Sequence, residues 1–177
     1  CCYNARMNSP KQIVLSWEDV DKLIDKLLPM FNNEYEAMVV ITRGGIIPGG
    51  LLAEAMNLEA VLTASVDFPA QWAIREQHKK DERFTIWPKF LQFPEADLIR
   101  DKKVLIVDDV WGSGRTISTV KYRVEGAGGK PSTCVLHFNP YRTLFGGERP
   151  DYFADVTSCY VIYPWEIQRG PDRISLL

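Results

Sequence analysis

Residues 104–116 have the sequence VLIVDDVWGSGRT, and this stretch carries the strongest indication of how the chain folds. Its first four residues, 104–107, form a continuous apolar run, which is typical of a central parallel strand covered on both faces. The run ends in two acidic residues, Asp108 and Asp109, and a short loop of glycine, serine and threonine follows. The stretch therefore predicts a buried strand, a tight turn and the start of a helix in immediate succession.

Helical and strand patterns alternate on both sides of this stretch. Helices are predicted over 16–31, after Pro48 and over 115–127, and strands over 38–41, 61–66, 133–138 and 159–163. A strand, a turn, a helix and a further strand in this order form a right-handed crossover unit. We therefore predict an α/β fold with a parallel sheet flanked by helices. Residues 13–177 are expected to form one domain, after a disordered or extended tail at 1–12.

Composition limits the classes of function. The chain has 177 residues and a net charge of −2, so it fits one domain and has no overall attraction for nucleic acid or anionic lipid. No apolar run approaches the roughly 20 residues that a membrane helix needs. The four cysteines form no metal or redox motif, which favours a reducing compartment. We expect a cytoplasmic protein; the alternative is an organelle matrix or stroma after removal of a transit peptide, because the chain begins with Cys.

The acidic pair and the loop after it combine two kinds of recognition. Asp108 and Asp109 can accept hydrogen bonds from ribose hydroxyls, either directly or through a divalent ion. Backbone N–H groups at a helix start, together with the hydroxyls of Ser113 and Thr116, suit a terminal phosphate. The pattern thus indicates a sugar phosphate ligand. The alternative is an acidic pair that simply caps the following turn.

The same stretch resembles the type I phosphoribosyltransferases, whose hallmark is this strand, acidic pair and loop that bind phosphoribosyl pyrophosphate (PRPP). The resemblance implies that the loop binds the 5′-phosphate through Gly112, Ser113, Gly114, Arg115 and Thr116. It covers most of residues 13–170, and it implies a small base-binding hood in addition to the sheet.

Two further segments resemble parts of the same family. Residues 42–49, TRGGIIPG, are similar to the pyrophosphate loop, which implies that Arg43, Gly44 and Gly45 bind pyrophosphate. In the family the bond before the first glycine is often cis, which would be the bond between Arg43 and Gly44. Residues 69–94 resemble a flexible flap that closes over the reacting centre. Taken alone, Arg-Gly-Gly is a common turn, and a charged connection of this kind is also compatible with a solvated loop.

The segment at 160–166, YVIYPWE, is similar to the base-binding end of hypoxanthine and xanthine-guanine phosphoribosyltransferases. The resemblance implies that Tyr160 stacks on the base, that Val161 lines its site and that Glu166 meets the base edge or a metal. Asn139 aligns with another base-binding position. Without the motif, Tyr160 could equally be a core aromatic residue.

Two positions depart from the family pattern. Members that act on 6-oxopurines usually carry Asp where this chain has Gly112, and that carboxylate contacts N7 of the base. They usually carry Lys where this chain has Asn139, and that Lys reads the 6-oxo group. Glycine cannot act as an acid or base, and Asn donates a hydrogen bond without charge. We therefore expect an intact PRPP side beside an altered base side.

The resemblance implies a Mg²⁺-dependent transferase that moves the ribose 5-phosphate of PRPP to hypoxanthine, xanthine or guanine. Asp108, Asp109 and Arg43 would be its catalytic residues, and Asp108, Asp109 and Glu166 would hold the metal, partly through PRPP. Its partners would be PRPP and a purine base, without nucleic acid or membrane, and a homodimer is expected. The alternatives are a non-catalytic PRPP- or nucleotide-binding regulator and a structural subunit that keeps the fold.

Overall fold

The computed structural model describes residues 11–32, 34–68, 88–144 and 147–167. Its main sheet contains β2 (Ala37–Ile41), β3 (Val61–Asp67), β4 (Lys89–Gln92), β5 (Lys103–Trp111), β6 (Lys130–Phe138) and β7 (Tyr152–Val156). The strands lie in the order β4-β3-β2-β5-β6-β7, and every pair is parallel except β3 with β4. The apolar run at 104–107 is thus part of a central strand, as the sequence predicts.

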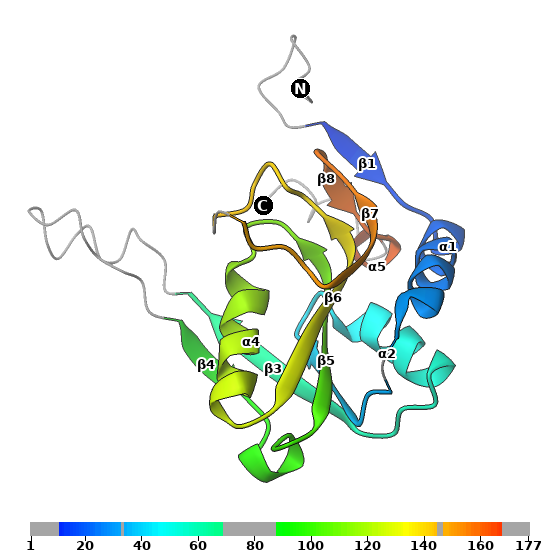
Figure 1. The fold of residues 1–177 in the computed structure, drawn as a ribbon. Coiled ribbons are helices and arrows are strands. Elements are labelled where there is room, and N and C mark those ends of the chain that lie inside the picture. The colour runs from blue at the N-terminus through cyan, green and yellow to red at the C-terminus, as the bar shows by residue number, and fades with distance from the viewer. Residues whose placement is uncertain (1–10, 33, 69–87, 145–146, 168–177) are drawn as a thin grey trace, which may run out of the picture.

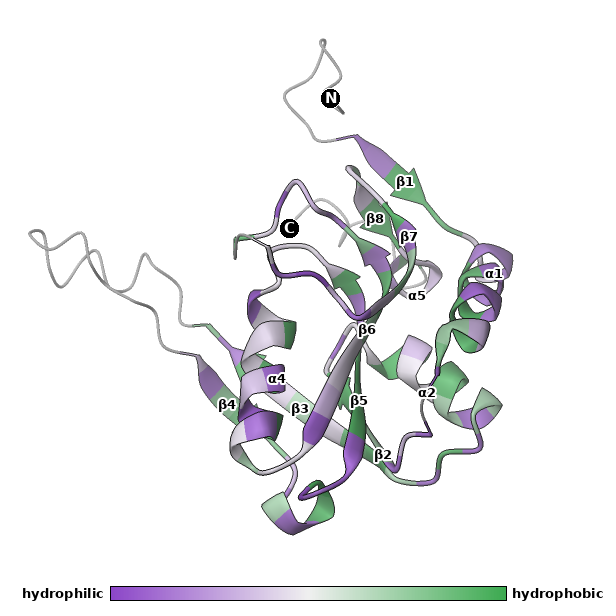
Figure 2. Cartoon of the chain, in the orientation of Figure 1, coloured by the Kyte–Doolittle hydropathy of each residue, from purple (hydrophilic) through white to green (hydrophobic). Residues whose placement is uncertain are grey.

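Helices cover both faces of this sheet (Figure 1). The helices α1 (Trp17–Leu27) and α2 (Ile46–Ala55) lie on one face, and α4 (Arg115–Gly126) lies on the other. Along β5, Leu105 and Val107 pack in the cluster with α1 and α2, whereas Val104 and Ile106 pack in the cluster with α4. Because successive side chains of a strand point to opposite faces, a continuous apolar run can fill both cores at once. Figure 2 shows this run in green at the centre of the molecule.

The first helix begins and ends for local reasons. Ser16 caps it: Ser16 Oγ accepts a hydrogen bond from the Asp19 amide at 3.2 Å, and Asp19 Oδ2 accepts one from the Ser16 amide at 2.9 Å. The helical pattern extends to Phe31 in the sequence, but α1 ends at Leu27 and a short 3₁₀ helix, Leu28–Met30, follows. Pro29 has no N–H to donate, so the α-helix does not continue through it.

A second, two-stranded sheet lies above the carboxyl end of β6 (Figure 1). It pairs β1 (Gln12–Val14) with β8 (Tyr160–Ile162) in parallel, and the short helix α5 (Pro164–Ile167) follows β8. The tail predicted for 1–12 falls mainly at 1–10, outside the described residues. The predicted flap at 69–94 also lies mostly outside them, at 69–87, and β4 belongs to its end. No helix in the described part of the chain has the length and apolar character that a membrane crossing needs.

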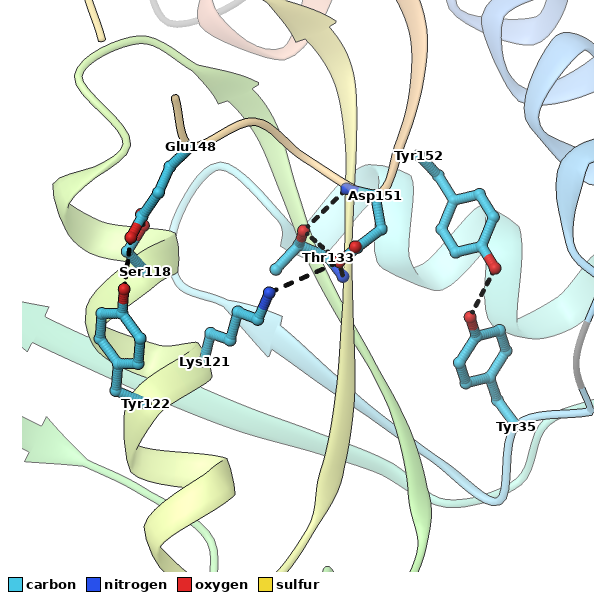
Figure 3. Close-up of polar contacts among 8 residues, drawn as sticks. All are labelled: Tyr35, Ser118, Lys121, Tyr122, Thr133, Glu148, Asp151 and Tyr152. Carbon is cyan, nitrogen blue, oxygen red and sulfur yellow. Dashed lines mark hydrogen bonds and ion pairs between the residues drawn. The ribbon is translucent and has the colours of Figure 1, made fainter. Parts of the chain in front are cut away.

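The connection from β6 to β7 returns along α4 and is held there by side chains (Figure 3). The carboxylate of Glu148 accepts hydrogen bonds from the hydroxyls of Ser118, at 2.8 Å, and Tyr122. Asp151 Oδ2 accepts hydrogen bonds from the amide and hydroxyl of Thr133, at 2.7 and 2.8 Å. The end of this connection is therefore fixed to α4 and β6 before β7 begins.

Candidate active site

The acidic pair lies inside β5, two residues before its end. Pairing of β5 with β6 continues past the pair, to Val110 opposite His137 and Trp111 opposite Phe138. The sequence suggests a strand that stops at the acidic pair, and this boundary is wrong because β6 is long enough to extend the ladder. Both carboxylates are half-buried, and Asp108 Oδ1 accepts a hydrogen bond from the Asp109 amide at 3.0 Å.

The electrostatic environment of the pair disfavours two negative charges. Burial raises the pKa of Asp108 well above its usual value, and the neighbouring charge of Asp109 raises it further. Burial also raises the pKa of Asp109 to about 7, with the charge of Glu166 acting in the same direction. A cation, or a ligand that donates hydrogen bonds from hydroxyl groups, would therefore stabilise the ionised pair.

The predicted pyrophosphate loop lies directly against this pair. A Cβ atom added at Gly44 would be 2.6 Å from Asp108 Oδ1 and 2.5 Å from Asp109 Oδ1, and one added at Gly45 would collide with the carbonyl oxygen of Val107. Only glycine allows the backbone to approach β5 so closely at these two positions. The geometry thus brings together two predicted parts of the site that are more than sixty residues apart in the sequence.

The cis peptide bond of this loop joins Thr42 to Arg43, one residue before the position that the resemblance implies. The two glycines that follow it lie flat against β5, and the amide of Gly45 donates a hydrogen bond to the carbonyl of Ile41 at 2.8 Å. This hydrogen bond closes a turn over residues 41–45, so Gly44 lies within the reversal of the chain. The side chain of Arg43 is exposed and makes no ion pair with another described residue.

The loop after β5 has the features of an anion site. Gly114 is the N-cap of α4 with φ +78°, a left-handed conformation that favours glycine, and in the described chain no side chain caps this helix end. The first turn of α4 carries no acidic residue, and its one hydrogen bond to a side chain in the described chain is a long one, from the Arg115 amide to Ser113 Oγ at 3.4 Å. The other N–H groups of this turn and the positive end of the helix dipole can therefore face an anion. The hydroxyl-bearing residues Ser113 and Thr116 are half-buried beside them. The guanidinium carbon of Arg115 lies 4.4 Å from the centre of the Phe68 ring. In this arrangement Arg115 contributes its backbone, and not its guanidinium, to the phosphate loop.

A pocket of about 100 Å³, partly open to solvent, adjoins the acidic pair. It is lined by residues of β5 and the loop after it, of the loop after β6, of β8 and the positions next to it, and of α5: Asp109, Val110, Gly112, Asn139, Arg142, Cys159, Tyr160, Val161, Tyr163 and Glu166. All four residues that the resemblance assigns to the base, Asn139, Tyr160, Val161 and Glu166, therefore meet in one place. Sequence reasoning missed Arg142 and Tyr163, although both lie within three residues of a predicted site residue.

Tyr163 joins several parts of this pocket. Its buried hydroxyl donates a hydrogen bond to the carbonyl of Asp109 at 2.9 Å and lies 3.0 Å from Nδ1 of His137. Because that hydroxyl has only one proton, His137 donates through Nδ1. The ring of Tyr163 stacks on Trp165 at 4.5 Å, and its amide donates to Glu166 Oε2 at 2.8 Å. One residue thus holds β5, β6 and α5 together beneath the pocket.

The two positions that depart from the family pattern both line the pocket. Asn139 is 3% exposed, and its Oδ1 accepts a hydrogen bond from the amide of Tyr141 at 3.2 Å, which fixes the side-chain amide. A Cβ atom added at Gly112 would meet nothing within 4 Å, so the space for a larger side chain exists there. Arg142 is the one cation among the lining residues and makes no ion pair within the described chain.

The donor set of the site fits Mg²⁺ only in combination with a ligand. Among the described residues, no three His, Cys, Asp or Glu side chains are grouped so that they could hold a metal by themselves. Mg²⁺ prefers oxygen donors and is commonly bound by one or two carboxylates together with substrate phosphates and water. Asp108 and Asp109 supply such carboxylates at a place where their own charges are unfavourable, so the residues present fit this metal.

Comparisons with known proteins agree with this arrangement. Residues 11–159 match the family described as the phosphoribosyl transferase domain. The chain is 27% identical over 174 residues to a xanthine-guanine phosphoribosyltransferase of Roseobacter denitrificans, covering 92% of this chain and 90% of the relative. It is 33% identical over 140 residues to one of Cereibacter sphaeroides, covering 77% and 72%. A crystal structure of a purine phosphoribosyltransferase from Pyrococcus horikoshii superposes with a TM-score of 0.73 at 25% identity, covering 88% of this chain and 94% of that one.

Proposed function

The chain belongs to the phosphoribosyl transferase domain family, and on that premise we propose that it transfers the ribose 5-phosphate of PRPP to a 6-oxopurine and releases pyrophosphate. The observation that carries this proposal is a convergence at one end of β5. The glycine loop at 44–45, the acidic pair and the phosphate loop at 112–116 adjoin one another, and the pocket begins at Asp109. The relatives named xanthine-guanine phosphoribosyltransferase support a base of the hypoxanthine, xanthine or guanine type.

Each part of the site has a defined task in this reaction. The amides and hydroxyls of residues 112–116 bind the 5′-phosphate, and Asp108 and Asp109 accept hydrogen bonds from the ribose hydroxyls. The backbone at Gly44 and Gly45, with Arg43 beside it, holds the pyrophosphate group as it leaves. Tyr160 lies at the pocket, where its ring can stack on the base.

The bond changes are a single substitution at C1 of the ribose. A nitrogen of the base forms a bond to C1 while the bond from C1 to the pyrophosphate oxygen breaks, and the pyrophosphate keeps that electron pair. Because residue 112 is glycine, no side chain there can accept the proton that the attacking nitrogen releases. We assign that proton to solvent, to which the pocket is open. The chain itself contributes mainly positioning and charge stabilisation.

Asp108 and Asp109 would hold Mg²⁺ together with oxygens of PRPP, with Glu166 as a further carboxylate in the same pocket. When bound, Mg²⁺ supplies positive charge that offsets the charge of the pyrophosphate. The raised pKa values of the two Asp side chains support this assignment, because a cation would favour their ionised forms.

The test is a pyrophosphate-release assay with PRPP, Mg²⁺ and a panel of hypoxanthine, xanthine, guanine, adenine and uracil. We expect release that depends on a 6-oxopurine, with the corresponding nucleoside monophosphate identified by chromatography. The Asp108→Asn/Asp109→Asn double variant is the matched control for contaminating activity. Absence of base-dependent release with every base would reject the transferase function.

One observation favours a second candidate, a non-catalytic regulator that binds PRPP or a nucleotide. Gly112 leaves the pocket without an acid at the position where purine-salvage members carry Asp, while the phosphate side keeps all its parts. Binding of PRPP, measured by calorimetry, without base-dependent pyrophosphate release would support this candidate over the enzyme.

A further inference from the structure

Trp111 occupies the point where the phosphate loop and the pocket meet. It is the last residue of β5 and is 2% exposed. Its ring lies against Gly114, where an added Cβ atom would be 2.6 Å from the indole nitrogen. The indole N–H donates a hydrogen bond to Thr143 Oγ1 at 2.9 Å, and the backbone carbonyl accepts one from the Asn139 amide at 2.9 Å. A single side chain thus contacts both loops.

The segment at 139–144, the pocket loop, is attached at both ends to this region. It begins at Asn139 and contains Arg142, and both of these residues line the pocket. At its other end the amide of Leu144 donates a hydrogen bond to the carbonyl of Ser113, in the phosphate loop, at 3.1 Å. Movement of the phosphate loop must therefore either carry the pocket loop with it or break these bonds.

We propose that Trp111 is a positioning residue that couples occupation of the phosphate loop to the shape of the base pocket. The inference rests on the proposed function, because it takes the two ligands to be a sugar 5-phosphate and a base. A phosphate bound at 112–116 fixes the backbone at Gly114 and hence the indole ring against it. The buried indole N–H cannot turn away from Thr143 without losing its acceptor, so it fixes the pocket loop in turn. By thermodynamic reciprocity, a base in the pocket favours phosphate binding by the same factor.

The alternative is that Trp111 only fills the core, where its ring also packs edge-on against Phe138 at 6.3 Å. A core role predicts that substitution weakens both ligands together, through loss of folded protein or general loosening. A coupling role predicts that the affinity of each ligand alone changes little, while their mutual enhancement is lost. The two roles therefore differ in a ratio of affinities.

The experiment measures the dissociation constant of hypoxanthine by calorimetry, with and without saturating ribose 5-phosphate. Ribose 5-phosphate carries the 5′-phosphate but no pyrophosphate, so no transfer takes place. In the wild-type protein we expect ribose 5-phosphate to tighten base binding by about 10-fold or more. We expect this ratio to fall below about 2-fold in Trp111→Phe and in Thr143→Val, with no further loss in the double variant, because both remove one hydrogen bond.

The matched control is Tyr122→Phe, which removes the hydrogen bond from the Tyr122 hydroxyl to Glu148. Glu148 lies in the same connection between β6 and β7, but after the pocket loop. This variant should keep the wild-type ratio. If Trp111→Phe does not fold, as judged by its thermal transition, Thr143→Val decides alone.

Three results would overturn the coupling. A ratio that is unchanged in the variants, with both affinities lowered in parallel, assigns Trp111 to the core only. A wild-type protein that binds both ligands independently rejects the coupling and leaves the proposed function standing. A wild-type protein that binds neither ligand rejects the coupling, and the pyrophosphate-release assay then decides the proposed function separately.

Discussion

The phosphate side and the base side of the site are built in different ways. On the phosphate side, contacts come from backbone at Gly44, Gly45 and Gly114, where any Cβ would collide with neighbouring atoms. On the base side, side chains from the ends of β6 and β8 and from α5 surround an open pocket, and Gly112 has free space around it. The first region therefore tolerates no added atoms, whereas the second can be altered without disturbing the fold. Substitutions should abolish function on one side and tune it on the other.

The sharpest test of this contrast is Gly44→Ala. The new Cβ atom would be 2.5 to 2.6 Å from the carboxylate oxygens of Asp108 and Asp109, so the loop or the pair must move. A displacement of about 1 Å at a reacting centre costs roughly 100-fold in rate, and we expect a loss of at least about that size in base-dependent pyrophosphate release.

Gly50→Ala is the control for this substitution, because Gly50 lies in α2 with nothing within 4 Å of its added Cβ. We expect it to keep full activity and to gain about 0.5 to 1 kcal/mol of stability, because alanine favours a helix more than glycine. Equal activity of both variants would show that the close approach at Gly44 has no part in function.

Asp108→Asn and Asp109→Asn test the ribose contacts. Asparagine accepts hydrogen bonds without charge, and a charge-assisted hydrogen bond contributes about 1.5 to 3 kcal/mol. We therefore expect each substitution to weaken PRPP binding by roughly 10- to 100-fold in calorimetry, with a thermal transition no lower than that of the wild type. Loss of folding instead of loss of binding would assign the pair to the structure of the turn.

On the base side, Gly112→Asp should increase function. The open space around Gly112 can take the side chain, and a carboxylate there can accept the proton of the base nitrogen. We expect transfer to hypoxanthine or guanine to rise about 10-fold, and to rise further with Asn139→Lys, because both groups act on one base. PRPP affinity should change little, because residue 112 is assigned to the 5′-phosphate through its backbone amide and not through a side chain.

Asn139→Lys also removes the acceptor of the Tyr141 amide, so alone it should gain less than Gly112→Asp. A wild-type protein that already works at ordinary enzyme rates would mean that these two positions matter little.

A different kind of effect is a pH dependence of stability that belongs to the phosphate side. Burial raises the pKa of Asp109 to about 7, whereas the pKa of Asp in an unfolded chain is about 4. At pH values between these two, the folded state binds more protons than the unfolded state. The free energy of unfolding therefore decreases as the pH rises through this window. The Asp109→Asn variant has no carboxyl group at this position and does not lose stability in this way. Its melting temperature, relative to that of the wild type, should therefore rise as the pH increases from 4 to 7. A constant difference across this range would contradict the raised pKa.

Much of the phosphate side was predictable because its residues are contiguous in the sequence. The strand, loop and helix at 104–127 occur as predicted, apart from the end of β5, which depends on pairing with β6. The strands β1, β4 and β7 were not predicted, because they have three to five residues and lie at sheet edges, where burial leaves no clear alternation. The sequence also did not predict three site residues, Arg142, Tyr163 and Trp111. Their places at the site depend on tertiary packing, and no local sequence pattern distinguishes them from surface or core residues.

The position of the site also follows from how the chain winds. Strands β2 and β5 are neighbours and run in the same direction, but the chain leaves β2 towards α2 on one face and leaves β5 towards α4 on the other (Figure 1). The two connections therefore diverge, and adjacent parallel strands whose connections diverge form a topological switch point, where open α/β sheets bind their ligands. In this protein Gly44 and the acidic pair face each other across that point. The location of the site is thus set by the handedness and order of the crossovers, and the local residues determine only which ligand it takes.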